Sequence, residues 1–181
     1  MDADALVAAL QETLPGVPLE LAPSIDLQTT IRVAPGDVLA VAQALRDRPA
    51  LAFAFLAEVT AVDRWPRAPR FELVYHLVSI EHALRVRLKV QLEDNAARVA
   101  TLSGLWPAAN WLEREVWDLF GIEFENHPDP RRLLMPEDWE GFPLRKDFPV
   151  QINQHVQSSS PMQVTEEEFR ANLQKDRLSR G

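Results

Sequence analysis

The sequence predicts an α+β fold: a mixed sheet of about four to five strands with helices packed on one side, followed by a long extended proline-rich C-terminal segment. A strand–helix–strand order is followed by several consecutive strands. Residues 127–149 contain five prolines, which exclude a long helix or a central strand there. We expect an α+β domain at 1–125, an extended partner-binding segment at 126–150, and a linker with a short helix at 151–181.

The first part of the chain alternates helical and strand patterns. Residues 2–14 have the apolar spacing of a helix, and residues 25–33 alternate apolar and polar side chains as a strand does. The next helix is bounded by Asp37 as its N-cap and by Pro49, which stops it. Residues 51–63 form a nearly continuous apolar run, which predicts a strand covered on both faces.

Three further strands are predicted in succession, at 71–80, 84–92 and 98–106. In the second of them every other residue is aliphatic and faces the core. Its outward-facing positions include the basic residues Arg85, Arg87 and Lys89. Such a row suits an acidic partner, but most rows of this kind are solvated faces, and that is the simpler interpretation.

A sharply bounded helix is predicted at 110–121, "NWLEREVWDLFG". Asn110 suits the N-cap, Glu113 stands at the third position of a capping box, and Gly121 suits the residue after the helix. Apolar residues occupy almost every side of this helix. We therefore expect it to lie between other elements rather than half-exposed on the surface.

The charges of this helix are expected to be partly buried or to face a partner; they are Glu113, Arg114, Glu115 and Asp118. Arg114 and Asp118, four residues apart, could pair along the helix. Glu113 and Glu115 have no local counter-ion, and a buried unpaired carboxylate costs several kcal/mol. The nearest cations in the sequence are Arg131, Arg132, Arg145 and Lys146. We expect Glu113 or Glu115 to bind one of these arginines and pin the proline-rich segment; alternatively, both glutamates reach water at the helix edge.

The composition excludes several function classes. A net charge of −8 gives no support for nucleic acid or an anionic membrane as the main partner. No apolar run approaches the roughly 18 residues of a membrane span, and the acidic N-terminus is unlike a signal peptide, so we expect a soluble, unexported protein. The absence of cysteine excludes thiolate-ligated iron–sulfur clusters and thiol catalysis.

The sequence contains no catalytic motif that we can identify. Six glycines leave little room for a phosphate cradle, and no P-loop or nucleophile elbow is present. His127 lies at the entry to the proline-rich segment, where a histidine is more often a turn residue bonded to backbone than a general base. We therefore expect no catalytic, cofactor-binding or metal-ligating residue in this chain. The alternative is a free-standing enzyme that uses Glu113, Glu115 and His127.

Residues 113–134, "EREVWDLFGIEFENHPDPRRLL", and the following "MPEDWEGFPLRKDFP" resemble the 30-kDa subunit of respiratory complex I, the NADH:quinone oxidoreductase. The likeness runs from about Glu58 to Val150. Pro130 stands where the family usually has Leu and Phe142 where it usually has His, and neither departure changes the assignment. The positions that match the family signature are Glu113, Arg114, Glu115, Asp118, Leu119, Phe120, His127, Arg131, Leu133 and Leu134.

This resemblance implies a non-catalytic structural or assembly subunit of the peripheral arm. Such a subunit packs against the 49-kDa subunit, near the cluster-bearing subunits around the quinone site. It carries no cofactor of its own, whereas the assembled complex would carry FMN, iron–sulfur clusters and quinone. It lies on the cytoplasmic face of the cell membrane in bacteria or the matrix side in mitochondria. A related membrane complex, either a ferredoxin- or F420-dependent dehydrogenase or a membrane-bound hydrogenase, is the alternative.

The proline-rich segment is expected to dock on partner subunits. Prolines keep it extended and so reduce the entropy lost on binding, while aromatic side chains act as anchors and arginines form directed ion pairs. Replacing Arg145 and Lys146 with alanine is predicted to weaken assembly without unfolding the domain. The expected interface residues are Glu113, Arg114, Glu115, Asp118, His127, Arg131, Arg132, Trp139, Phe142, Arg145, Lys146 and Phe148.

Overall fold

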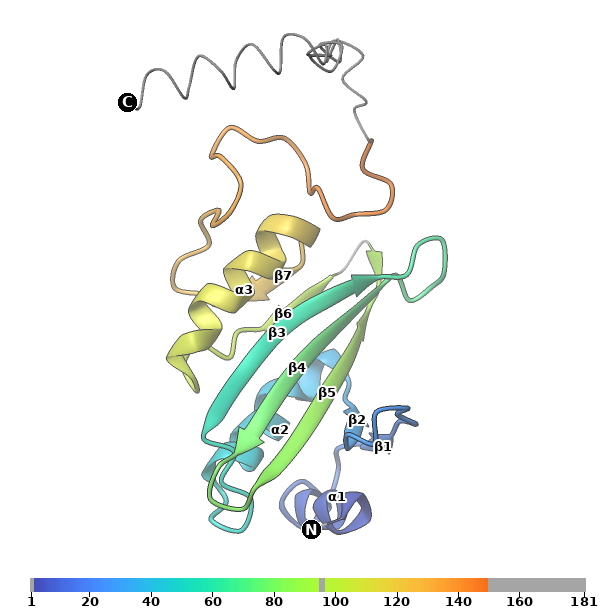
Figure 1. The fold of residues 1–181 in the computed structure, drawn as a ribbon, viewed down its shortest axis with the longest axis vertical. Coiled ribbons are helices and arrows are strands. Elements are labelled where there is room, and N and C mark those ends of the chain that lie inside the picture. The colour runs from blue at the N-terminus through green and yellow to red at the C-terminus, as the bar shows by residue number, and fades with distance from the viewer. Residues whose placement is uncertain (1, 95–96, 150–181) are drawn as a thin grey trace, which may run out of the picture. The chain divides into compact units, whose positions relative to one another are not determined.

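The computed structural model describes residues 2–94 and 97–149 (Figure 1). A mixed five-stranded sheet forms its centre, with the strand order β1-β2-β5-β4-β3. The strands are β1 (Glu20–Leu21), β2 (Thr30–Arg32), β3 (Phe55–Asp63), β4 (Phe71–Ser79) and β5 (Leu84–Leu92). The predicted α+β fold with a mixed sheet is confirmed.

Strands β3, β4 and β5 form an antiparallel meander, and β2 runs parallel to β5. Tyr75 of β4 lies between Val59 of β3 and Leu88 of β5 in the register. Side chains alternate between the faces of a sheet, so these three residues share one face, and all three are buried. The predicted alternation in β5 is also confirmed, since its inward positions from Val86 onward are buried.

The helices cover that same face of the sheet. They are α1 (Ala3–Thr13), α2 (Val38–Asp47), which follows the short 3-10 turn η1 (Pro35–Asp37), and α3 (Pro107–Phe120). Buried residues of all three helices, such as Leu10, Val41 and Val116, join the inner face of the sheet in a single apolar cluster. In Figure 1, α2 lies behind the sheet and α3 runs alongside β3. The prediction of helices on one side is thus confirmed.

Two predicted strands are shorter than their apolar patterns. The strand expected at 25–33 begins only at Thr30, because Leu27 has a left-handed φ of 58° and both Ile25 and Leu27 are exposed. The strand expected at 51–63 begins at Phe55 and is not covered on both faces, since Phe55 is 51% exposed. Leu51 and Phe53 are buried in the turn before β3 and account for the apolar start of that run.

The last predicted strand, 98–106, is also wrong in extent. Only β6 (Arg98–Ala100) forms, and it pairs in parallel with β7 (Glu123–Glu125) in a separate two-stranded sheet. The remaining residues lead into α3, which begins at Pro107 rather than at Asn110. Proline suits the first turn of a helix because its missing N–H would have no partner there.

Only some of the helix caps predicted from the sequence are present in the structure. Gly121 ends α3 in the left-handed conformation at φ 73°, as predicted, and its N–H bonds the Trp117 carbonyl. Asp37 precedes α2, but it belongs to the 3-10 turn and its side chain makes no capping bond. Asp2 does cap α1, because its carboxylate accepts a 2.8 Å hydrogen bond from the N–H of Ala5.

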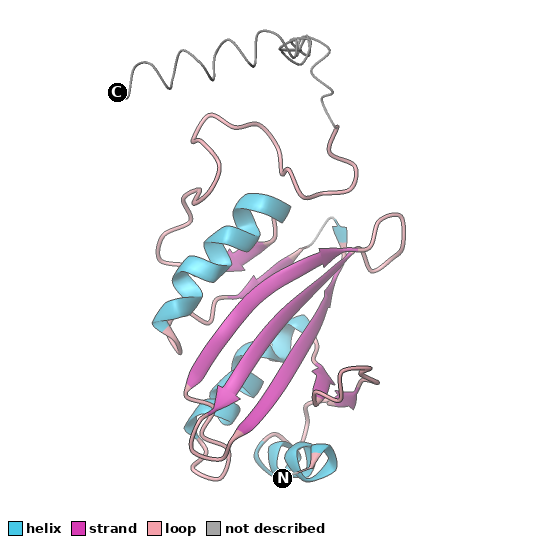
Figure 2. Ribbon diagram, viewed as in Figure 1, coloured by secondary structure: helices cyan, strands magenta, loops and turns pink. Residues whose placement is uncertain are grey.

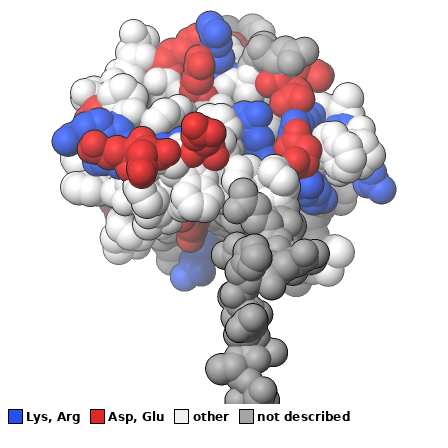
Figure 3. Space-filling model, turned by 90° about the horizontal axis from the view of Figure 1, so that it is seen from above, with Lys and Arg blue, Asp and Glu red and all other residues white. Residues whose placement is uncertain are grey.

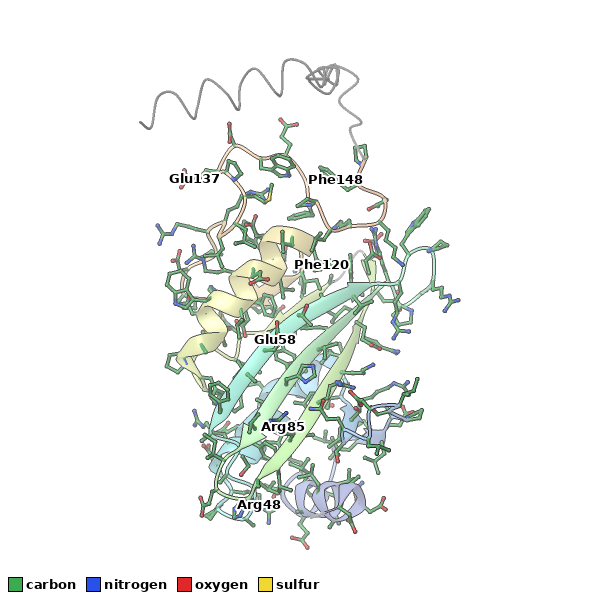
Figure 4. The ribbon with its side chains drawn as sticks, in the orientation of Figure 1. Arg48, Glu58, Arg85, Phe120, Glu137 and Phe148 are labelled. Carbon is green, nitrogen blue, oxygen red and sulfur yellow. The ribbon has the colours of Figure 1, made fainter. Side chains whose placement is uncertain are left out.

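Residues 127–149, called here the proline-rich segment, contain neither helix nor strand (Figure 2). As far as Phe148, the segment nevertheless belongs to the same compact unit as the sheet and the helices. Figure 4 shows its labelled residues Glu137 and Phe148 beyond the C-terminal end of α3, where Phe120 is labelled. The linker and short helix predicted at 151–181 lie outside the described residues.

Candidate functional site at α3 and the proline-rich segment

Asp118 of α3 is the main anchor of the proline-rich segment. The residue is fully buried, and its Oδ1 accepts a 2.6 Å hydrogen bond from Nη1 of Arg132. Its Oδ2 accepts the backbone N–H groups of Leu133, Leu134 and Met135 at 3.0, 2.7 and 2.9 Å. Burial alone would raise the pKa of Asp118, but the three amides and the guanidinium outweigh it and hold that pKa below its usual value. One carboxylate of α3 thus binds four consecutive residues of the segment, from Arg132 to Met135.

Arg114 makes a second connection between the same two elements. Its Nε and Nη2 each donate a 2.9 Å hydrogen bond, to the carbonyl oxygens of Arg131 and Arg132. Its Nη1 also lies 3.4 Å from Oδ2 of Asp129, and its guanidinium carbon lies 5.1 Å from the centre of the Trp111 ring. The predicted pairing along the helix with Asp118 is therefore absent, because both side chains bind the segment instead.

Glu113 is fully buried and faces the domain rather than the segment. Its Oε1 accepts a 2.7 Å hydrogen bond from the N–H of Leu102, and its Oε2 accepts one from the hydroxyl of Thr101. Desolvation by burial raises the pKa of Glu113 to about 7, although both hydrogen bonds favour the charged form. The prediction that Glu113 or Glu115 pins the segment through an arginine is wrong, since Asp118 does so.

Glu115 lies on the same helix with its side chain half-buried. Within residues 2–94 and 97–149 it forms no ion pair with arginine or lysine. The alternative, that both glutamates reach water at the helix edge, is also wrong, because Glu113 is fully buried and only Glu115 keeps partial exposure. The difference follows from the helical repeat, because the two residues point in directions about 200° apart.

His127 joins the start of the segment to α3 through backbone groups. Its Nε2 lies 3.1 Å from the carbonyl oxygen of Asn110 and therefore donates, while its Nδ1 accepts a 3.0 Å hydrogen bond from the N–H of Asp129. Both ring nitrogens bond backbone, as expected for a structural histidine. The Nε2 atom also lies 3.8 Å from Oε2 of Glu113.

Arg145 binds a backbone carbonyl at the C-terminal end of α3. Its Nε donates a 2.6 Å hydrogen bond to the carbonyl of Phe120, and its guanidinium carbon lies 4.6 Å from the centre of the Phe142 ring. The N–H of Leu144 donates to the carbonyl of Leu119 at 3.1 Å. The carbonyls at the end of a helix lack partners within it, and here the segment supplies them. A Cβ on Gly121 would lie 2.5 Å from the Phe142 ring, so only glycine allows this approach.

A third anchor is centred on Arg70, which was not among the predicted interface residues. Arg70 binds Asp63 through Nε and Nη2 at 3.1 and 3.0 Å, and it also binds Asp94 and Asp147. The N–H of Lys146 donates to Asp63 at 2.8 Å, whereas the Lys146 side chain is exposed. The cluster therefore connects the ends of β3, β4 and β5 with the segment. The sequence signal that could have indicated this cluster is the presence of oppositely charged residues at the ends of neighbouring predicted strands.

The remaining predicted interface residues lie at the surface of the segment. Arg131 is 74% exposed and pairs with Asp129 at 2.6 Å. Trp139 and Phe148 stack with their ring centres 6.3 Å apart. Acidic and basic side chains are interspersed on this end of the molecule (Figure 3). Arg145 is part of the fold, so its replacement is expected to loosen the domain, whereas replacement of Lys146 is not.

Comparison with known families decides the assignment. The family model described as the respiratory-chain NADH dehydrogenase 30-kDa subunit matches residues 31–154, more than half of the chain. The chain belongs to this family. The match begins earlier than the resemblance noted from Glu58 onward, and it includes α3 and the whole proline-rich segment of this member of the 30-kDa subunit family.

Individual relatives agree with this membership. One subunit of the NADH-quinone oxidoreductase of Rhizobium meliloti is 49% identical over 118 residues, which cover 65% of this chain and 64% of that protein. The chain thus matches slightly less than two thirds of that relative's length. A trypsin-resistant fragment of Nqo5 is 31% identical with a TM-score of 0.56, and the match covers 71% of this chain and 99% of the fragment.

A chain from a different assembly has the same fold as this 30-kDa-family protein. It belongs to the membrane-bound sulfane sulfur reductase, an archaeal respiratory membrane complex, and is 27% identical with a TM-score of 0.65. That match covers 82% of this chain and 86% of the other. In residues 2–94 and 97–149, no three side chains of histidine, cysteine, aspartate or glutamate are placed to hold a metal ion. The described helices include none that is long and apolar enough to cross a membrane.

Proposed function

We propose that this chain is a non-catalytic structural and assembly subunit in the peripheral arm of a proton-translocating NADH:quinone oxidoreductase. It packs against the 49-kDa subunit near the quinone site, on the cytoplasmic side of the membrane in a bacterium. Electrons pass from NADH through the flavin and iron–sulfur clusters of other subunits to quinone. Membership in the 30-kDa subunit family and 49% identity to a subunit of a bacterial NADH-quinone oxidoreductase support this proposal.

The observation that carries the docking role is an ordered segment with exposed apolar side chains. Ion pairs at Asp118 and Arg70, together with the hydrogen bond from Arg145 to the carbonyl of Phe120, hold the proline-rich segment against the domain. The segment nevertheless leaves Leu134 and Leu144 59% and 51% exposed, together with Trp139 at 39%. Because the backbone is already held in place, a partner that covers these side chains loses little conformational entropy on binding. Large apolar side chains of this kind are typical anchors of interfaces.

The contacts of the signature residues support a structural rather than a catalytic role. Glu113, Arg114, Asp118 and His127 are buried, and each bonds backbone groups of the same chain. A general acid or base needs a polar atom within reach of a substrate. These side chains instead fix the position of the segment relative to α3. We infer that the family signature preserves the shape of an interface.

Gentle extraction of the tagged chain from membranes, followed by identification of its partners by mass spectrometry, tests the proposal. Recovery of a 49-kDa homologue with flavin- and cluster-bearing subunits is expected. Recovery of a lone monomer under several detergents would contradict it.

The exposed side chains of the segment offer a sharper test with a matched control. The double variant Leu134→Ala and Leu144→Ala, which truncates two exposed side chains, is expected to recover fewer partner subunits while its melting temperature stays unchanged. Ile80→Ala removes a side chain that is 74% exposed on the turn between β4 and β5, and it should assemble normally. Equal recovery of partners by both variants would remove the segment from the interface.

A second candidate function is the same subunit role in a related membrane complex. The similarity to a chain of the archaeal sulfane sulfur reductase favours this candidate. The same extraction distinguishes the two. Co-purification of ferredoxin- or F420-dependent subunits, or of a hydrogenase subunit, would replace the NADH-linked assignment and leave the docking role intact.

A further inference from the structure

A cavity of about 410 Å³ opens between α3, β7 and the start of the proline-rich segment. Trp117 and Phe124 give it aromatic surface, and the buried Glu113 also lines it. Glu123 and Glu125 line it from β7, where both are exposed. The cavity therefore combines two exposed carboxylates, those of Glu123 and Glu125, with aromatic surface, and the buried carboxyl of Glu113 lies beside it.

The charges around this cavity do not balance. Arg114 is already paired with Asp129, and Glu123 is paired with Arg98 at 3.2 Å. Both ring nitrogens of His127 already bond backbone groups, those of Asn110 and Asp129. Among the described residues, neither Glu113 nor Glu125 pairs with an arginine or lysine. The excess charge in the cavity is therefore negative.

We propose that this cavity receives a basic side chain, arginine or lysine, from a neighbouring subunit. The inference rests on the proposed function in that it requires a partner in a complex. A cation in this position would meet the exposed carboxylate of Glu125 and lie close to the aromatic side chains of Trp117 and Phe124. Glu113 is fully buried beside the cavity, so its carboxyl acts on the cation through its charge and not through a direct hydrogen bond.

A basic side chain fits this cavity better than a metal ion. The described residues contain no group of three carboxylate or histidine side chains arranged to hold a metal. A guanidinium or ammonium group needs only one or two carboxylates and gains from aromatic walls, whereas hard metal cations require several oxygen ligands.

The protonation state of Glu113 supplies an independent signature of binding. Burial raises the pKa of this carboxyl to about 7, so it is partly protonated at neutral pH when the cavity holds no cation. A cation beside it favours the charged form, and the pKa then falls. Binding of the partner side chain therefore releases a proton from Glu113.

Charge reversal at the mouth of the cavity tests the proposal in the assembled complex. Glu125→Lys places a like charge where the partner cation would lie, and recovery of partner subunits is expected to fall at least about tenfold. Glu81→Lys is the matched control: it makes the same change in net charge at an exposed residue of the turn between β4 and β5. Melting temperatures of both full-length variants establish that folding is intact.

The outcomes separate this inference from the proposed function. A selective loss of partners with Glu125→Lys supports the cavity. Equal recovery by the Glu125 and Glu81 variants overturns the cavity and leaves the subunit role standing. Failure of the unsubstituted chain to recover any partner contradicts the subunit role itself.

A second measurement examines the cavity without a partner complex. The carboxyl of Glu113 is titrated by NMR in the purified full chain, with and without N-acetyl-arginine methylamide as the probe. A lowered pKa for Glu113 in the presence of this probe, absent with the uncharged N-acetyl-glutamine methylamide, supports the inference. An unchanged pKa with both compounds overturns it.

Discussion

Asp118 of α3 and Arg132 of the proline-rich segment form a buried ion pair of 2.6 Å, and the same carboxylate binds three consecutive backbone amides of the segment. The amides and the guanidinium together satisfy the charge that burial would otherwise penalise. The arrangement explains how a stretch with five prolines adopts one conformation without helix or strand. Asp118 and Arg114 of α3 supply backbone groups of the segment with hydrogen bonds that secondary structure would otherwise provide.

Removal of this carboxylate is predicted to release the segment. Asp118→Asn leaves Arg132 without its counter-charge and presents an amide group to backbone N–H donors. We expect the free energy of unfolding to fall by about 3–5 kcal/mol, as for other broken buried ion pairs. Urea denaturation measures this, and limited proteolysis should detect earlier cleavage within the segment. Glu115→Gln on the same helix is the control and should change stability by less than about 0.5 kcal/mol.

Stability is predicted to depend on pH through Glu113. Its pKa is raised from 4.5 to about 7 in the folded state, so the folded protein binds the proton more tightly than the unfolded chain does. The stability that this group contributes is fully present below about pH 4.5 and is lost as the pH rises to about 7, a change of roughly 3 kcal/mol.

Glu113→Gln isolates this effect from other titrating groups. The difference in unfolding free energy between the unsubstituted chain and the variant should change over the interval from pH 4.5 to 7 and stay constant above it. Urea denaturation at several pH values measures the difference. A difference that is independent of pH across that interval would contradict the raised pKa.

Gly121 is predicted to be intolerant of any side chain. Its φ of 73° disfavours other residues, and a Cβ would lie 2.5 Å from the Phe142 ring and 2.6 Å from Nη2 of Arg145. Gly121→Ala is expected to lower stability by more than about 1 kcal/mol. Hydrogen exchange at the N–H of Leu144, which bonds the end of α3, should also become faster.

Gly104→Ala provides the comparison for that variant. A Cβ at Gly104 would meet no atom within 4 Å, and its φ lies outside the left-handed range. We expect this substitution to leave both the melting temperature and the exchange at Leu144 unchanged. Similar losses in the two alanine variants would show that crowding at Phe142 is not the cause.

Arg70 is predicted to be required for folding stability and for resistance to acid. Burial would raise the pKa of Asp63, but the hydrogen bonds from Arg70 and two backbone amides lower it to about 2. Stability from Asp63 is therefore present above about pH 4 and is lost as the pH falls to about 2. Arg70→Met leaves this buried carboxylate without its cation, and a loss of about 3–5 kcal/mol is expected at neutral pH.

Circular dichroism during acid titration measures the second effect of Arg70→Met. Its unfolding transition should move to higher pH, because the pKa of Asp63 returns toward its usual value. Arg67→Met alters an exposed residue in the same loop and should leave the transition in place. A normal acid transition in the Arg70 variant would mean that the amides alone stabilise the Asp63 carboxylate.

Local patterns in the sequence predicted the long strands β4 and β5 and the end of helix α3. The alternation along β4 and β5, the apolar periodicity of α3 and the glycine at its end each depend on neighbours within a few residues. The family signature was equally visible, because a family likeness is read directly from residue types at fixed spacing. These features established the α+β class and the 30-kDa family.

The partners of the buried charges were not predictable in the same way. Glu113 binds Thr101 and Leu102, and Arg70 binds Asp147 from 77 positions away. The β6–β7 pair, three residues in each strand, is likewise formed between segments far apart in the chain. No local pattern specifies which of several carboxylates will lie beside a given arginine.

The sequence by itself determined the class of fold, the family and the presence of an apolar segment that forms no regular structure. Only the tertiary structure decided that Asp118, rather than Glu113 or Glu115, holds that segment, and that Glu113 lines a cavity with excess negative charge. The physical reason lies in the distances over which the determining forces act. Backbone conformation and side-chain periodicity are set by nearby residues, whereas the burial and pairing of a charge depend on every element packed around it.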